Sequence, residues 1–210
     1  MGCTQSSSAE GSVVETPNSK EANFHNSYPV YGAEEIMSRK GHGTYSKPVQ
    51  RNLLYGCDFQ TADRICNYNR SFAEHAGYFT SGKRNVPFLE AIQEAKKQKN
   101  KSITFYDSNT GKPLFTAPVN RTWDEWLKES KAHGWPSFRD AEVNWDHVRT
   151  LRNGEAVSVH GTHLGHNLPD SKGNRYCINL VSVAGNAVTE VELVNKSREQ
   201  PIEVTMVEAL

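Results

Sequence analysis

The amino-acid sequence predicts a mainly β fold of the α+β class, in which a small antiparallel β domain follows a helical segment. Two features predict it. After about residue 102, short runs of β-branched and aromatic residues alternate with turns rich in glycine and asparagine. Before that point, apolar residues recur at helical spacings. The chain has 210 residues, and we expect one core with appendages.

Composition and periodicity divide the chain into four segments. Residues 1–45 are polar with few aliphatic side chains, so we expect a flexible tether that cannot offset its ordering entropy by burial. Residues 46–101 are predicted to form a helical extension that packs on the main domain. Residues 102–195 are predicted to form that domain, and residues 196–210 a C-terminal tail.

Helices are expected in three places. One or two short helices are predicted around residues 61–72, and another over residues 85–101, where a basic run at the end needs solvent. The third begins with Thr122 as N-cap and Glu125 three residues later, which is the pattern of a capping box, and it ends at His133-Gly134. One face of this helix carries Trp123, Trp126 and Leu127.

Strands are predicted where short runs of β-forming residues are bounded by turn residues. The predicted strands are residues 103–106, 113–115, 148–151, 156–159, 175–183 and 188–194. A turn at residues 107–111 separates the first two. Short strands linked in this way favour a small, mainly antiparallel β domain.

Charge and cysteine content exclude several classes of protein. Lysine plus arginine (24) equals aspartate plus glutamate (24), so no overall field attracts nucleic acid, and we expect no nucleic-acid partner. The four cysteines are too few and too unevenly spaced for a secreted disulfide scaffold, which indicates free thiols in a reducing compartment. The sequence has no secretory signal and no run of about 18 apolar residues. A cytoplasmic location is therefore predicted.

The first residues suggest a lipid anchor. Met1-Gly2-Cys3-Thr4-Gln5-Ser6 fits the pattern for myristoylation of Gly2, and Cys3 would offer a second site for palmitoylation. Two chains are needed because a single myristoyl group binds membranes only marginally. The alternative is an ordinary polar N-terminus with a chance glycine. The lipid interpretation predicts a membrane-associated protein.

Residues with chemical potential gather in three blocks, at 133–138, 163–166 and 174–179. If residues 175–183 form a strand, Cys177 and Asn179 point to the same face, since side chains alternate along a strand. Arg175 shares that face and would favour the thiolate, which is the nucleophilic form.

Two imidazoles and an indole could complete a thiol site. One imidazole of His163 and His166 can polarise or protonate an oxygen while a thiolate attacks, and the indole of Trp135 would form an apolar wall. Residue types alone leave other interpretations open. Cys177 could be a small buried hydrophobe. His163 and His166 could be half of a metal site, although zinc needs three or four ligands and the sequence offers no completing pair.

Three motifs follow one another along the chain: Gly134-Trp135-Pro136-Ser137-Phe138, His163-Leu164-Gly165-His166 and Arg175-Tyr176-Cys177-Ile178-Asn179. In this order they resemble the signatures of the methionine-R-sulfoxide reductase family. The residues Gly111-Lys112-Pro113-Leu114-Phe115 also resemble the beginning of a strand in that family. The similarity covers residues 103–185, under half of the chain. It implies two small antiparallel sheets of the family's type with peripheral N-terminal helices.

The resemblance also implies a role for each matching residue. Cys177 would attack the sulfur of methionine-R-sulfoxide, release methionine and be left as a sulfenic acid. The other catalytic residues, which would hold and help protonate the sulfoxide oxygen, are His163, His166 and Asn179. The substrate-binding residues are Trp135, which would face the methyl group, with Phe138 and Arg175.

The chain departs from the family at its zinc site. Many members bind zinc through two Cys-x-x-Cys pairs, and those four positions are here Asp107, Thr110, Val157 and His160. A tetrahedral thiolate site is impossible with these side chains, so we expect no zinc and no other bound cofactor. Stability would then come from apolar packing and the N-terminal segment.

A second departure concerns the resolving cysteine, because His133 occupies the family's commonest position for it. The sulfenic acid on Cys177 would instead be resolved by Cys57 or Cys66, if residues 48–78 fold over the site, or directly by an external thiol. Thioredoxin or another dithiol donor would supply the electrons.

Three functions remain open at this point. The first is a membrane-anchored oxidoreductase that repairs methionine-R-sulfoxide, in oxidised proteins or as the free amino acid. The second is a binding module on the same fold that recognises thioethers or a partner without turnover, since fold does not imply function. The third is a redox sensor in which peroxide oxidises Cys177. The loop at residues 166–177 is shorter than is usual in the family, which leaves the substrate open.

Overall fold

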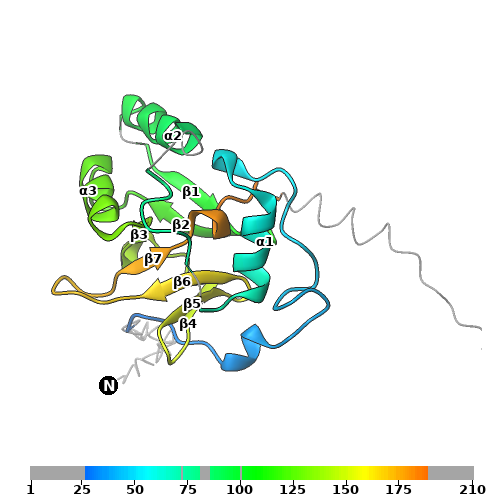
Figure 1. The fold of residues 1–210 in the computed structure, drawn as a ribbon. Helices are drawn as coiled ribbons and strands as arrows, with labels where there is room; N and C mark the ends of the chain where they lie inside the picture. The colour runs from blue at the N-terminus through cyan, green and yellow to red at the C-terminus, as the bar shows by residue number, and fades with distance from the viewer. Residues whose placement is uncertain (1–26, 72, 81–85, 100, 189–210) are drawn as a thin grey trace, which may run out of the picture.

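The computed structural model describes residues 27–71, 73–80, 86–99 and 101–188 (Figure 1). Gly2, Cys3 and the predicted tail at 196–210 lie outside these ranges. Within them the chain has an α+β fold with three α-helices and two antiparallel sheets, one of two strands and one of five. This is compatible with the mainly β class predicted from the sequence.

The two sheets are built from different parts of the chain. β1 (Ile103–Tyr106) and β2 (Pro113–Ala117) pair as the predicted hairpin and form the smaller sheet. In the larger sheet every neighbouring pair is antiparallel, and the order is β3-β7-β6-β5-β4. Its strands are β3 (Ser137–Phe138), β4 (Val148–Thr150), β5 (Glu155–Ser158), β6 (His163–Asn167) and β7 (Tyr176–Ile178).

Some strand predictions need correction. The strand predicted over residues 175–183 is only β7, because the chain turns after Ile178 into the 3-10 helix η5 (Leu180–Ser182). Val188 lies in no strand, and residues 189–194 are outside the described part. β6 has no counterpart among the predicted strands. Its sequence, His-Leu-Gly-His-Asn, lacks the run of β-forming residues that marks a strand.

The helices lie where the sequence predicts them. α1 (Phe59–Tyr68) begins after Asp58, whose carboxylate accepts a hydrogen bond from the backbone N of Thr61 at 2.9 Å. α2 (Val86–Lys97) follows in the extension. α3 (Trp123–His133) has the predicted capping box, and Gly134 ends it in the left-handed conformation. Among the described helices, none is long and apolar enough to cross a membrane.

Aromatic rings form the main core, between α2, α3, the small sheet and β3 (Figure 1). Phe138 stacks on Phe115 with ring centroids 4.4 Å apart, and its ring also contacts Phe105 and Trp126. All four side chains are fully buried. Each such ring removes a large apolar area from water, and these contacts therefore dominate the packing of the domain. The predicted apolar face of α3 is buried as well, at Trp123, Trp126 and Leu127.

The helical extension packs on the main domain as predicted. Ala62, Ile65 and Cys66 of α1 form a second apolar cluster with Val49 and Val181. Because Val181 lies in η5, this cluster places α1 directly behind the segment that follows the predicted catalytic cysteine.

The tether predicted for residues 1–45 is wrong for residues 27–45. Backbone hydrogen bonds of 3.0 Å join Val30 and Gly32 to Thr150, so the chain runs along the edge strand β4 (Figure 1). Beyond that point the 3-10 helix η1 (Glu34–Met37) buries Met37 in a small apolar cluster. Composition misses this order because one anchoring side chain and a covered sheet edge are enough to hold a polar segment. The two remaining 3-10 helices are η2 (Leu54–Gly56) and η4 (Asp140–Glu142).

Candidate active site

Cys177 lies in a polar row that crosses the larger sheet. Its partner on β3 is Ser137 and its partner on β6 is His166, and His166 in turn faces Glu155 on β5. Residues directly opposite one another in antiparallel strands have side chains on the same face and in reach of each other. The strand register therefore brings a hydroxyl, a thiol, an imidazole and a carboxylate together on one face.

A β-bulge adds His163 to this face. The pairing shifts between Ala156 and Val157, so that Leu164 is an extra residue on β6 and His163 lies opposite Val157. Without the bulge, two histidines three residues apart would point to opposite faces of the sheet. The spacing His-x-x-His and the bulge together place both imidazoles on one side, with ring centroids 5.6 Å apart.

Gly165 is required between the two histidines. A Cβ atom added there would lie only 2.0 Å from the carbonyl oxygen of Cys177. Its φ of 157° is also one that side-chain-bearing residues rarely adopt. Close approach of β6 to the cysteine therefore depends on a residue without a side chain.

The thiol of Cys177 is held by two polar neighbours. The side chain is 7% exposed, Nη1 of Arg175 donates to Sγ, and the hydroxyl of Ser137 lies 3.9 Å away. Burial raises the pKa of the thiol, while Arg175 and Ser137 oppose that shift and leave it incomplete. Cys177 is therefore mainly a thiol at neutral pH, and it needs a base to form the thiolate.

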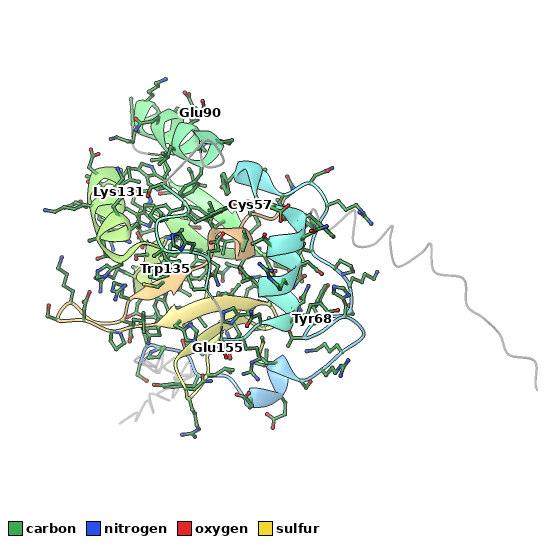
Figure 2. The ribbon with its side chains drawn as sticks, in the orientation of Figure 1. Cys57, Tyr68, Glu90, Lys131, Trp135 and Glu155 are labelled. Atoms are coloured by element: carbon green, nitrogen blue, oxygen red, sulfur yellow. The ribbon has the colours of Figure 1, made fainter. Side chains whose placement is uncertain are left out.

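A carboxylate fixes the orientation of His163. Nδ1 of His163 lies 2.8 Å from Glu155, and a guanidinium N of Arg70 lies 2.7 Å from the same carboxylate. Although burial raises the pKa of Glu155, its bonds to His163 and Arg70 outweigh that effect and lower it. An ionised carboxylate only accepts hydrogen bonds, so Nδ1 carries a proton and Nε2 faces away from Glu155. Glu155 is labelled in Figure 2.

The surroundings of His166 favour its neutral form. Burial and the neighbouring His163 lower the pKa of His166. It is therefore a neutral imidazole at pH 7, and a neutral imidazole opposite a thiol can accept the thiol proton.

Asn179 and Trp135 meet at one residue of the extension, Glu74. The backbone N of Glu74 donates to the side-chain oxygen of Asn179 at 2.8 Å, and the indole Nε1 of Trp135 donates to the carbonyl of Glu74 at 2.9 Å. Asn179 follows β7 rather than lying within it, so its orientation comes from this contact and not from strand alternation alone. Trp135 is labelled in Figure 2.

Among the described residues, three buried polar atoms of this region make no hydrogen bond. They are Nε2 of His163, Nδ2 of Asn179 and Nε of Arg175, and the last of these lies 3.4 Å from Asp170. Buried polar groups are nearly always satisfied, so each such atom calls for an explanation. A bound oxygen atom with free lone pairs would satisfy both a protonated Nε2 and the amide.

Phe138 is not a substrate-binding residue. It pairs with Tyr176, so it points to the face opposite Cys177, where it is fully buried in the aromatic core. The prediction failed because neighbours in a motif were assigned one role, although adjacent residues of a strand face opposite sides.

Neither of the two candidate resolving cysteines is among the residues that contact the thiol of Cys177. Cys66 is fully buried, with Sγ 3.5 Å from the hydroxyl of Ser182. Cys57 is half-buried, at the position labelled in Figure 2. Burial raises the pKa of both thiols. Within the described residues all cysteines are free thiols, and internal resolution stays a prediction.

The four positions of the family's zinc cysteines carry other contacts. Asp107 accepts hydrogen bonds from Thr110 at 3.0 Å and from Thr162 at 2.9 Å. Asn109 donates to Thr162 at 2.8 Å within this corner, and it joins the corner to the extension through paired amides with Asn67 of α1. A polar network that reaches α1 thus occupies this corner of the fold. Val157 is buried beside Met37, and His160 stacks near His147.

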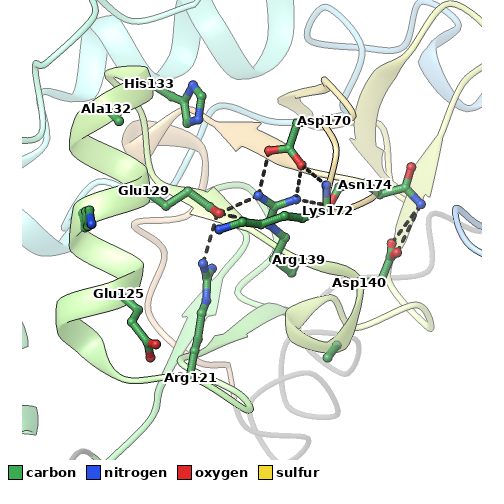
Figure 3. A pocket seen from close by; sticks show the side chains of 12 residues that line it. Arg121, Glu125, Glu129, Ala132, His133, Arg139, Asp140, Asp170, Lys172 and Asn174 are labelled. Carbon is green, nitrogen blue, oxygen red and sulfur yellow. Dashed lines mark hydrogen bonds and ion pairs between the residues drawn. The ribbon is translucent and has the colours of Figure 1, made fainter.

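A charged cavity of about 750 Å³ is lined by residues of α3, of η4 and of the loop between β6 and β7 (Figure 3). Arg139 pairs there with Glu129 and with Asp170, and the exposed His133 lines the same cavity. Asp170 also lies 3.4 Å from Nε of Arg175, which contacts Cys177 on its other side. Neither Cys177 nor Arg175 lines the cavity, and the link from the cavity to the thiol runs from Asp170 through Arg175.

No family model matches the chain, and no curated protein or solved structure was found to be similar to it. Interpretation therefore rests on the geometry of the site.

Sequence reasoning missed four residues that shape this site: Ser137, Glu155, Arg70 and Glu74. Ser137 lies within a motif, and Glu155 is a charge at the start of the short strand Glu-Ala-Val-Ser. Arg70 and Glu74 carry no local signal, because only tertiary packing of the extension brings them to the sheet.

Proposed function

We propose that this protein reduces methionine-R-sulfoxide to methionine with Cys177 as nucleophile, on a divergent fold of the methionine-R-sulfoxide reductase type. The observation that carries the proposal is the row of Ser137, Cys177 and His166, with the unpartnered Nε2 of His163 and Nδ2 of Asn179. These are the groups needed to attack a sulfur atom and to hold the oxygen bonded to it.

The first step makes the nucleophile. Neutral His166 accepts the proton of the Cys177 thiol, and the guanidinium of Arg175 stabilises the thiolate by charge and by its hydrogen bond. The thiolate is needed because a thiol is a poor nucleophile. Arg175 thus serves the thiol more directly than it serves the substrate.

The second step transfers one oxygen atom. The amide of Asn179 donates to the sulfoxide oxygen, and imidazolium at His163, stabilised by Glu155, donates its Nε2 proton to that oxygen. The thiolate attacks the sulfur of the protonated sulfoxide and forms an S–S bond. The hydroxyl group then moves from that sulfur to Sγ of Cys177, so that the S–O and S–S bonds break and the thioether leaves. Thiol and sulfoxide become sulfenic acid and thioether, so the proton taken by His166 balances the one given by His163.

The sulfenic acid must then be reduced. A dithiol such as thioredoxin supplies two electrons, becomes a disulfide and releases water. We propose direct attack by this external thiol, because the raised pKa and burial of Cys66 make it a poor resolving group. No bound cofactor enters this scheme. The substrates are oxidised proteins or the free amino acid.

The deciding experiment is an assay of dabsyl-labelled methionine-R-sulfoxide beside the S form, with dithiothreitol as reductant and Cys177→Ser as the matched control. We expect turnover of the R form that is lost in the variant, because serine keeps the shape but removes the nucleophile. Thioredoxin-driven turnover should survive in the Cys57→Ser/Cys66→Ser double variant.

The same assay separates the rival functions. Folded, reduced protein that turns over neither form faster than Cys177→Ser would sink the reductase and leave a binding module. Rapid oxidation of Cys177 by peroxide in the absence of turnover would instead identify a sensor.

A further inference from the structure

Glu74 is a buried carboxylate that the proposed reaction does not use. Its side chain is 6% exposed, and both carboxylate oxygens accept backbone hydrogen bonds at the start of η5, from Leu180 and from Val181 at 3.3 Å. The backbone of the same residue bonds to the side chains of Asn179 and Trp135. One residue of the extension therefore touches four points around the site.

Among the described residues, no cation forms an ion pair with this carboxylate. The titratable groups that face Glu74 are the thiols of Cys57 and Cys66, which burial keeps protonated. Burial raises the pKa of Glu74 to about 7, while the bonds from Leu180 and Val181 act in the opposite direction. A buried carboxylate of this kind costs stability when it ionises, so stability alone does not explain a glutamate here.

We propose that Glu74 is a positioning residue that sets the orientation of Asn179 and Trp135 for binding the sulfoxide group. The inference rests on the reductase function proposed above. Its carboxylate ties residues 73–80 to η5, and this attachment holds the two backbone groups of Glu74 in place. Because Asn179 accepts at its oxygen from Glu74, its Nδ2 is left as the free donor aimed at a ligand.

The two contacts act on different parts of a methionine sulfoxide. The amide of Asn179 meets the oxygen, and the indole of Trp135 offers an apolar wall to the methyl group. With the oxygen and methyl positions both fixed by this segment, the R and S forms differ in which of the two remaining positions on sulfur carries the rest of the side chain. Glu74 is therefore expected to control stereoselectivity as well as rate.

Ionisation of Glu74 should control the attachment of its carboxylate to η5. A carboxylate accepts from two N–H groups at once, whereas a protonated carboxyl has one oxygen that donates. Activity should therefore rise as pH increases through about 7 and Glu74 ionises. The thiol of Cys177 has a raised pKa and His166 a lowered one, so their titrations fall on either side of this range.

The test compares Glu74→Gln and Glu74→Asp with Glu90→Gln, which removes one exposed carboxylate from α2. Glu74→Gln should lower kcat for the R form on the order of tenfold to a hundredfold, as expected for misplaced binding groups. It should also lose the rise in activity near pH 7 and some preference for R over S. Glu74→Asp should restore part of the rise in activity near pH 7 and part of the preference for R. Glu90→Gln should match the parent.

A readout without turnover separates this inference from the function. The indole N–H signal of Trp135, assigned with Trp135→Phe, should shift with pH through about 7 in the parent and stay constant in Glu74→Gln. If no reductase activity is found but the signal titrates, the function fails and the positioning contact stands. If Glu74→Gln folds, keeps the parent's pH profile and R preference, and does not alter the titration, the positioning role is overturned.

Discussion

Arg70 joins two carboxylates that differ in surroundings. Its guanidinium contacts Glu34, whose side chain is 61% exposed, at 2.6 Å, and Glu155, which is 1% exposed, at 2.7 Å. Exposed ion pairs contribute little, whereas removing one partner of a buried pair leaves a charge without compensation. Arg70 therefore contributes much to the stability of the buried charge on Glu155 and little to that of the exposed charge on Glu34.

This contrast gives a matched pair of variants. Glu155→Gln should lower kcat by about tenfold or more, because His163 loses the carboxylate that orients it and stabilises its imidazolium. Glu34→Gln removes the same charge from the same arginine and should leave kcat unchanged. Steady-state kinetics over pH check both, and equal effects of the two variants would contradict the assigned role.

At the scale of elements, prediction succeeds where the signal is local. The capping box of Thr122 and Glu125 and the terminal Gly134 are contained in α3 and its flanks, so its bounds follow from the sequence. β7 is shorter than predicted because Glu74, far away in the chain, captures the backbone of Leu180 and Val181. β-strand propensity does not predict β6, because its histidines and glycine are residues of the candidate site and not good β formers.

The segment along β4 offers a test of how an element is held. Met37 is the buried residue of η1 and packs with Leu151 and Val157. Met37→Ala should lower the free energy of unfolding by roughly 2–5 kcal/mol, as core truncations do. The exposed neighbour Glu35, changed to Ala, should stay within about 0.5 kcal/mol of the parent. Urea unfolding measures both, and equal values would restore the flexible tether predicted from composition.

For the whole molecule, the residues of the candidate site were largely predictable and their partners were not. Cys177, Trp135 and the two histidines belong to recognisable motifs. Arg70 and Glu74 come from the extension, and sequence patterns contain no information on which distant segment covers a given face. The same holds for Asn67 and Asn109, whose paired amides exist only once α1 has docked.

The N-terminal pattern predicts attachment of the whole molecule to a membrane. In cells supplied with an alkyne-tagged myristate, the protein should be labelled, and Gly2→Ala should lose the label. Cys3→Ser should keep the label but shift towards the soluble fraction, since one acyl chain anchors only weakly. An unlabelled parent protein would leave Gly2 as a chance glycine.

The way Arg70 and Glu74 reach the sheet has a consequence for grafting. The motifs between residues 103 and 185 look like a cassette that could be excised and moved to another scaffold. Such a cassette would carry the thiol, but Glu155 would be a buried anion without its arginine, and the side-chain oxygen of Asn179 would lose its donor. The smallest transferable unit of this chemistry therefore begins before residue 70, with α1 included.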